Sequence, residues 1–330
     1  MSNAHPMVEL WRGNLLESNH FGHAVICDAK GIVEAWGDPS TVIFPRSSCK
    51  MIQALPLVET GAADAAGLTE AHLALACASH QGEHRHVDMT GRWLESLGLD
   101  EADLRCGTHE PYDHAERDRL IKSDTSPCQL HNNCSGKHSG FLTVTRHLNA
   151  GPEYVAIDHP LQIAIKAATE EVTGEASPGH GIDGCSAPNF ATTVTGLARA
   201  MASFAAAKDT GSVRCRAMYR LTRAMATYPE LVAGDGRACT ELMRAMGGRV
   251  AIKTGAEAVF VAILPEQGLG MALKIVDGGG RAAEAAIAAL LIRAGVLEAN
   301  HPATLKRLNA VQTNRRGLET GILQAAPDFP

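Results

Sequence analysis

The sequence predicts an α+β fold in which both ends of the chain build one antiparallel sheet flanked by helices, and the middle forms a mostly helical lobe. Strand-like segments occur at 23–37 and again after residue 250, whereas the residues between them mainly show helical periodicity. No repeat, low-complexity tract or linker divides the 330 residues. We therefore expect a single domain with two lobes: a sheet lobe from about 7–60 and 248–330, and a helical lobe from about 61–247.

The N-terminal part of the sheet is predicted from a hairpin pattern. HAVICD and IVEAWG, within 23–37, are joined by an Ala-Lys-Gly turn in which Gly31 can adopt a positive φ. FPRSSCK follows, with Pro45 just before a helix that we expect to begin at or near Ser47. Apolar residues continue the helical spacing, at Met51, Leu55 and Val58.

The middle of the chain alternates helices with polar, Gly-containing loops. Helices are predicted at 69–79 and 83–97, separated at SHQGE, and then at 158–173 and within 192–225. The segment 106–140 contains HNNCSGKHSG and is predicted to form a structured loop. GHGIDGCSAPNFA is a second Gly-rich loop. Loops of this kind often carry functional side chains.

The C-terminal part of the sheet is predicted from two alternating segments. VFVAILPE and GLGMALKIVD are joined by a turn at Gln267 and Gly268, and an Ala-rich helix is expected at 281–294.

Composition restricts the class of function. Hydrophobic residues make up 45% and charged residues 20%, which is typical of a globular protein and excludes a disordered or fibrous chain. A net charge of −6 without a dense Lys/Arg run argues against nucleic-acid binding, so a small molecule is the expected partner. No apolar run reaches the ~20 residues of a membrane span, and MSNAHPMVEL lacks signal-peptide features, so we expect a cytoplasmic protein. The nine cysteines show no CxxC spacing, and most are expected to be reduced and buried.

Ser47 and Lys50 form an SxxK motif at the start of a predicted helix. Residues i and i+3 share a helix face, and a helix N-terminus favours negative charge developing on the serine oxygen. This pattern is typical of a serine nucleophile with a lysine base. The alternative is an N-cap serine followed by a solvated lysine, because SxxK also occurs by chance.

A second motif, Lys253-Thr254-Gly255, lies near the opposite end of the chain on a predicted sheet strand. SxxK at a helix start together with KTG on a late strand is the pairing of penicillin-recognising serine enzymes. A lysine acts as a base only when neutral, and two lysines beside one pocket, Lys50 and Lys253, would lower each other's pKa.

Two further segments carry reactive groups. Ser79, in the helix break at SHQGE, could relay a proton or act as an alternative nucleophile, or it could simply cap a loop. Cys134, Lys137 and His138 lie in NNCSGKH, and Cys185 lies in DGCSAPN. Thiols on polar loops, with a histidine or a neutral lysine, could form a tetrahedral zinc site. The spacing matches no zinc finger, so a hydrogen-bonded loop is the alternative.

Five segments, PRSSCK, CASHQGE, HNNCSGKHSG, GIDGCSAPN and KTGAEA, stand in this order. Together they resemble the signature segments of the zinc-associated Ser-Lys L-asparaginase family. The resemblance spans nearly the whole chain and implies a fold similar to serine β-lactamases and glutaminases. Two positions depart from the expected pattern: Met51 stands where we expect proline and Ala258 where we expect glycine.

The resemblance implies a role for each matching residue. Ser47 would be the nucleophile and Lys50 its base, with Ser79 and Lys253 as a second Ser-Lys pair. The implied zinc ligands are Cys134, Lys137 and Cys185, with water as the fourth. The implied substrate-binding residues are Arg46, His138 and Asp183, which could hold an α-carboxylate and an α-amino group.

The implied activity is hydrolysis of the side-chain amide of L-asparagine through an acyl-enzyme, in a homodimer. One alternative is a serine acyl-transfer hydrolase that acts on glutamine, β-lactams or esters. The other is a non-catalytic protein that binds a metal or an amino acid, and the two serines and two lysines at reactive spacing argue against it.

Overall fold

The computed structural model describes residues 3–330, and the chain divides into two compact units. The sheet unit comprises the chain up to Ser48 together with Thr192–Ala206 and Glu241–Pro330. The helical unit comprises Cys49–Ala191 and Ala207–Thr240. The boundaries differ from the expected lobes at 49–60, which belong to the helical unit, and at 192–206 and 241–247, which belong to the sheet unit.

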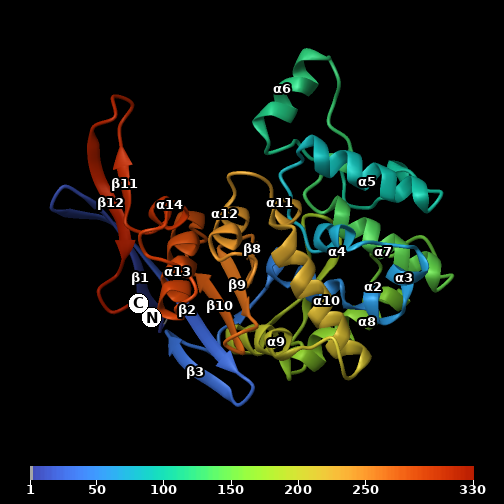
Figure 1. Ribbon diagram of the computed structural model, residues 1–330, viewed down its shortest axis with the longest axis horizontal. Helices are drawn as coiled ribbons and strands as arrows, with labels where there is room; N and C mark the ends of the chain where they lie inside the picture. The colour runs from blue at the N-terminus through green and yellow to red at the C-terminus, as the bar shows by residue number, and fades with distance from the viewer. Residues whose placement is uncertain (1–2) are drawn as a thin grey trace. The chain divides into compact units, whose positions relative to one another are not determined.

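The sheet unit contains an antiparallel sheet in the order β11-β12-β1-β2-β10-β9-β8, with β3 paired to β2 (Figure 1). Its strands are β1 (His5–Arg12), β2 (Leu15–Asp28), β3 (Gly31–Trp36), β8 (Ala251–Gly255), β9 (Val259–Leu264), β10 (Leu269–Ile275), β11 (Ala310–Thr313) and β12 (Glu319–Ala325). N-terminal and C-terminal strands pair directly, β1 with β12 and β2 with β10. The prediction of an α+β fold with a sheet built from both chain ends is therefore confirmed.

Two helices cover this sheet. Helix α13 (Gly280–Arg293) contacts β1, β9, β10 and β12, and α9 (Val194–Ala206) contacts β2, β9 and β10. Every residue of β9 is buried, so side chains on both of its faces are covered. The approach of α9 requires Gly270 on β10, because a Cβ there would lie 2.0 Å from the backbone nitrogen of Ala202. Short strands β4 (Val42–Ile43) and β7 (Thr192–Thr193) pair with each other in this unit.

The helical unit is built around α4 (Glu70–Ala76), which packs against α7 (Ser135–His147), α10 (Val213–Thr227) and α11 (Pro229–Val232). The other helices of this unit are α1 (Lys50–Gln53), α2 (Leu55–Glu59), α3 (Ala62–Ala65), α5 (His84–Ser96), α6 (His114–Lys122) and α8 (Pro160–Thr173). The 3-10 turns η2 (Glu101–Asp103) and η3 (Gln129–His131) and the paired strands β5 (His180–Ile182) and β6 (Pro188–Phe190) complete it. Helix α12 (Ala238–Ala245) begins in the helical unit, and α14 (Pro302–Leu305) lies in the sheet unit.

Several local predictions differ from the structure. The helix expected from Ser47 is interrupted: a 3-10 turn, η1 (Arg46–Cys49), precedes α1 and α2. The expected loop at 106–140 contains α6, η3 and the first turns of α7. Strands β1, β11 and β12 were not predicted from periodicity. Within residues 3–330, no helix is long and apolar enough to cross a membrane.

Candidate active site

Ser47 lies in the 3-10 turn η1 of the sheet unit, and its side chain is half-buried. The next residue, Ser48, is fully buried, and its hydroxyl donates a hydrogen bond of 2.7 Å to the carbonyl oxygen of Pro45. Of the two adjacent serines, only Ser47 therefore has a side chain that a ligand can reach. Arg46 precedes it with a φ of 53°, a strained conformation for a residue with a side chain.

Strand β8, which carries the KTG motif, runs beside this serine turn. A Cβ at Gly255 would lie 2.6 Å from the carbonyl oxygen of Pro45 and 3.0 Å from the amide nitrogen of Ser48, so the approach requires glycine. Lys253 is fully buried, and its Nζ donates a hydrogen bond of 2.8 Å to the carbonyl oxygen of Thr254. The structure thus brings together two motifs that are about two hundred residues apart in sequence.

Lys50 begins α1 in the helical unit, three residues after Ser47 on the same run of helical turns. Its buried Nζ donates to two carbonyl oxygens, that of Ala78 and, at 3.3 Å, that of Asn133. These carbonyls directly precede Ser79 and Cys134. Lys50 therefore connects two segments of the helical unit, the one that carries Ser79 and the one that carries Cys134 and Lys137.

Ser79 follows α4, and its backbone is held in place by a hydrogen bond from its amide to the carbonyl oxygen of Val232, at 2.9 Å. Its residue exposure is 8%, so it is nearly buried.

The two predicted loop thiols meet in the helical unit. Cys134 is the N-cap of α7, and Cys185 lies in the turn between β5 and β6. The thiol of Cys134 has two acceptors within reach, the sulfur of Cys185 and Oδ1 of Asn133 at 3.0 Å, and Lys137 in the first turn of α7 donates to the sulfur of Cys185 at 3.0 Å. All three are at most 4% exposed. Cys134, Lys137 and Cys185 therefore form one buried cluster, which we call the thiol cluster.

The pKa values of the two cysteines in the thiol cluster are shifted in opposite directions. The hydrogen bond from Cys134 lowers the pKa of Cys185 well below its ordinary value, and the ammonium of Lys137 lowers it further. The same hydrogen bond, with burial, raises the pKa of Cys134. Burial alone would lower the pKa of Lys137, but the charges and hydrogen bond of the two cysteines raise it. The cluster therefore favours one thiolate, one thiol and one ammonium.

This donor set fits zinc under one condition. Sulfur ligands favour Zn²⁺, and two are already in contact. No three His, Cys, Asp or Glu side chains among residues 3–330 converge as a metal site would require. A zinc ion held here would need Lys137 as its third protein ligand, and an ammonium group binds a metal only after losing its proton.

The remaining predicted residues surround the thiol cluster. His138 is fully buried; its Nδ1 lies 2.8 Å from the hydroxyl of Tyr154, and its ring also interacts with the side chain of Cys185. Burial lowers the pKa of His138 to about 4. Asp183 is half-exposed in the turn that carries Cys185. The predicted roles of His138 and Asp183 in binding substrate stay predictions.

Two residues that position the site were not predicted from the sequence. Asn133 supplies an acceptor for Lys50 and lies within HNNCSGKH, so the density of polar residues there was a usable signal. Tyr154 binds His138 and also accepts a hydrogen bond from the amide of Arg105 at 2.7 Å. Nothing in the local sequence around Tyr154 indicates that role.

Comparison with known proteins gives a family and several distant structures. A family model described as L-asparaginase II matches residues 8–325. A search of curated proteins returned no match. A β-lactamase from Mycobacterium bovis is 15% identical with a TM-score of 0.46, over 84% of this chain and 95% of the other. A putative β-lactamase from Bacteroides dorei is 11% identical with a TM-score of 0.43, over 77% and 84%. A protein named Mglu is 12% identical with a TM-score of 0.44, over 89% and 66%. At these TM-scores the structural likenesses carry no argument about activity.

Proposed function

The chain belongs to the L-asparaginase II family, and from this premise we propose that it hydrolyses the side-chain amide of L-asparagine to L-aspartate and ammonia. Membership supports an amidohydrolase that acts on a small amide. The choice of Ser47 as nucleophile rests on one observation above all: the KTG strand lies against the turn in which Ser47 is the accessible serine.

In the proposed reaction, the Ser47 oxygen attacks the carboxamide carbon while Lys50 takes the hydroxyl proton. The tetrahedral intermediate collapses with loss of the amide nitrogen, which takes a proton and leaves as ammonia. Water then attacks the ester on Ser47 and releases aspartate. Lys50 must enter this cycle as a neutral amine. Backbone N–H groups near the start of the helical turn would stabilise the oxyanion.

The other residues would support these steps. Ser79 and Lys253 would relay protons. Arg46 would bind the substrate α-carboxylate, and Asp183 with His138 would bind its α-amino group.

Zinc is the proposed cofactor, held by Cys134, Lys137 and Cys185 with a water molecule. When bound, it would supply a fixed positive charge that orients substrate or the loops carrying these ligands. Activation of the nucleophile is assigned to Lys50 alone, since a Ser-Lys pair already supplies it.

The first experiment measures ammonia release from L-asparagine and L-glutamine by purified protein, with metal content read on the same sample. Asparagine is expected to be the better substrate. Ser47→Ala should reduce kcat by at least about a thousandfold, because loss of a nucleophile removes the covalent route. Ser48→Ala is the matched control: it loses only the buried hydrogen bond to Pro45 and should keep most of the activity. Full activity in Ser47→Ala would exclude Ser47 as nucleophile.

A second candidate function is acyl transfer on β-lactams or esters, which the same contact between the KTG strand and the serine turn favours. Hydrolysis of nitrocefin without ammonia release from asparagine would support it. The homodimer and the cytoplasmic location stay predictions, and light scattering on the purified protein tests the first of them.

A further inference from the structure

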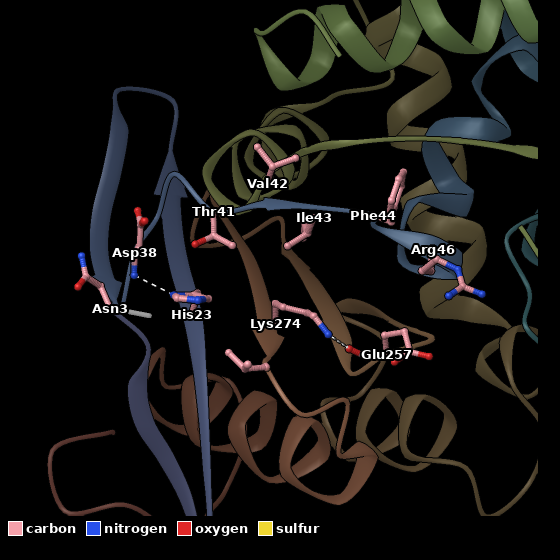
Figure 2. A pocket seen from close by; sticks show the side chains of 11 residues that line it. Asn3, His23, Asp38, Thr41, Val42, Ile43, Phe44, Arg46, Glu257 and Lys274 are labelled. Carbon is pink, nitrogen blue, oxygen red and sulfur yellow. Dashed lines mark hydrogen bonds between the residues drawn. The ribbon is translucent and has the colours of Figure 1, made fainter. Parts of the chain in front are cut away.

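The sheet unit contains a cavity of about 530 Å³ that none of Ser47, Lys50, Ser79 and Lys253 lines (Figure 2). Its wall comes from β2, the segment 38–46 around β4, the turn before β9, and β10 with the residue after it. The lining residues are Asn3, His23, Asp38, Thr41, Val42, Ile43, Phe44, Arg46, Glu257, Lys274 and Val276. A volume of this size is within the range of small-molecule sites.

One part of the wall is apolar although it is open to solvent. Val42 is 56% exposed, Phe44 48% and Val276 50%. Single exposed apolar side chains are ordinary, but three that line one cavity form a surface whose burial by a ligand would be favourable. An apolar group of a ligand is the natural complement of this part.

The other part of the wall carries separated charges of both signs. The ammonium of Lys274 is half-buried in the middle of the cavity wall, where it donates one hydrogen bond to the carbonyl oxygen of Glu257 and has two further donors (Figure 2). The carboxylate of Glu257 is exposed and forms no ion pair among residues 3–330. A ligand that carries both a carboxylate and an ammonium group would complement these two residues.

The polar part of the wall is also rigid. The ring nitrogen Nδ1 of His23 accepts a hydrogen bond of 2.8 Å from the amide of Asp38, which leaves the proton on Nε2 as a fixed donor. Glu257 has a φ of 58° and Arg46 a φ of 53°, both in the left-handed region. Strained backbone of this kind is retained where surrounding structure fixes it, and it often occurs at ligand sites.

We propose that this cavity binds a zwitterionic α-amino acid with a branched or aromatic apolar side chain, at a site that adjoins Arg46 but contains none of Ser47, Lys50, Ser79 and Lys253. Lys274 binds the carboxylate, Glu257 binds the ammonium group, and Val42, Phe44 and Val276 cover the side chain. The charges of Lys274 and Glu257 match a zwitterion, whereas a simple fatty acid or an alkylamine leaves one of them without a partner. The cavity reaches Arg46, the residue before Ser47, so occupancy is close enough to influence asparagine binding.

The test is calorimetric titration of L-leucine and L-phenylalanine into the Ser47→Ala protein, with saturating L-aspartate present. Measured in this way, binding does not depend on whether the chain hydrolyses asparagine. One equivalent is expected to bind. Three compounds each lack one group of L-leucine: glycine lacks the apolar side chain, 4-methylpentanoate the ammonium, and 3-methylbutylamine the carboxylate. Each should bind at least about tenfold more weakly than L-leucine, since each leaves one part of the cavity wall without its partner.

Variants locate the site. Lys274→Met and Glu257→Gln should each weaken L-leucine binding by about tenfold or more, and Val276→Gln should weaken it with the polar contacts intact. Lys30→Met, an exposed lysine in the turn between β2 and β3, is the matched control and should bind as the parent does. Melting curves establish that each variant is folded. The proposal is overturned if the parent binds neither amino acid, if L-aspartate displaces L-leucine one for one, or if folded Lys274→Met, Glu257→Gln and Val276→Gln all bind normally.

Discussion

Ala258 occupies a position where the backbone favours glycine. Its φ is 57°, and it follows Glu257 at 58° in the turn between β8 and β9. This is the position at which the family resemblance leads us to expect glycine, and the structure gives the physical reason. A Cβ in the left-handed region is strained by about 1–2 kcal/mol, and glycine has no such strain.

Ala258→Gly should therefore raise the free energy of unfolding by about 0.5–1 kcal/mol, the relief of strain exceeding the added entropy of the unfolded chain. Urea denaturation of the parent and the variant measures this change in the free energy of unfolding. Ala256→Gly is the matched control, because Ala256 in the same turn has a negative φ and should lose about as much stability as Ala258→Gly gains. Equal destabilisation by both substitutions would contradict the role assigned to the φ of Ala258.

Gly255 is the residue through which the KTG strand approaches the serine turn. Gly255→Ala should place a methyl group 2.6 Å from the carbonyl oxygen of Pro45, so the turn that carries Ser47 must move. We expect ammonia release to fall at least about tenfold, since displacement of a nucleophile by about 1 Å is costly. Gly280→Ala, at a helix start where a Cβ meets nothing within 4 Å, should keep full activity. Unchanged kinetics in Gly255→Ala would mean that this contact does not position the serine.

At the scale of elements, a buried pair of histidines connects the Ser79 segment to α5. His80 and His86 stack with ring centroids 4.7 Å apart. His80 Nδ1 accepts from the amide of Gly82, so its Nε2 donates to the hydroxyl of Ser135 at 2.9 Å. Burial lowers the pKa of His80 well below its ordinary value, and the charges of His86 and Lys50 act in the same direction. His80 is therefore neutral in the folded protein.

This arrangement predicts a loss of stability in mild acid. Below the ordinary histidine pKa of about 6.5, the unfolded chain binds a proton at position 80 that the folded protein does not bind, so stability falls as pH decreases towards the folded-state pKa. The slope is at most about 1.4 kcal/mol per pH unit for this one histidine. Urea midpoints of the parent and of His80→Gln between pH 7.5 and 5.5 measure it, and the variant should lose less stability. Ser135→Ala retains the histidine and should retain most of the slope. Parallel pH profiles for the parent and His80→Gln would refute the assignment.

Sequence patterns predicted elements best where the pattern and the packing coincide. The strands β2, β3, β9 and β10 and the helix α13 occur where the sequence predicts them, although β2 begins at Leu15 and β9 is apolar and buried along its whole length instead of alternating. The helix expected from Ser47 instead consists of a 3-10 turn at 46–49, α1 and α2, with a break at Ala54 just before Pro56, and hydrophobic periodicity does not show this division.

Candidate site residues could be selected from the sequence, but their geometry could not. SxxK, KTG and the two Gly-rich loops singled out Ser47, Lys253, Cys134 and Cys185 as candidates. The contact between the two thiols depends on long-range packing, because Cys134 caps α7 while Cys185 is held in a turn about fifty residues later. Tyr154 had no local signal at all.

For the whole molecule, the proposed catalytic residues are divided between the two units. Arg46, Ser47 and Lys253 belong to the sheet unit, and Lys50, Ser79 and the thiol cluster belong to the helical unit. Neither unit alone contains a nucleophile together with its proposed base. Activity should therefore require that both units are folded, and it should be lost when the less stable of them unfolds.

The three tryptophans allow this to be measured. Trp11 and Trp36 lie in the sheet unit, whereas Trp93 is buried in the helical unit, with its Nε1 donating to Thr143. Trp93→Phe retains Trp11 and Trp36, so its fluorescence reports unfolding of the sheet unit. The double variant Trp11→Phe/Trp36→Phe retains only Trp93, so its fluorescence reports unfolding of the helical unit. In urea, ammonia release from each protein should disappear at the lower of the two fluorescence midpoints. If the units unfold together, all three curves should coincide, because their folding is then one cooperative event. Activity that persists beyond the unfolding of either unit would show that one unit holds a complete site, and the division of catalytic residues proposed here would be wrong.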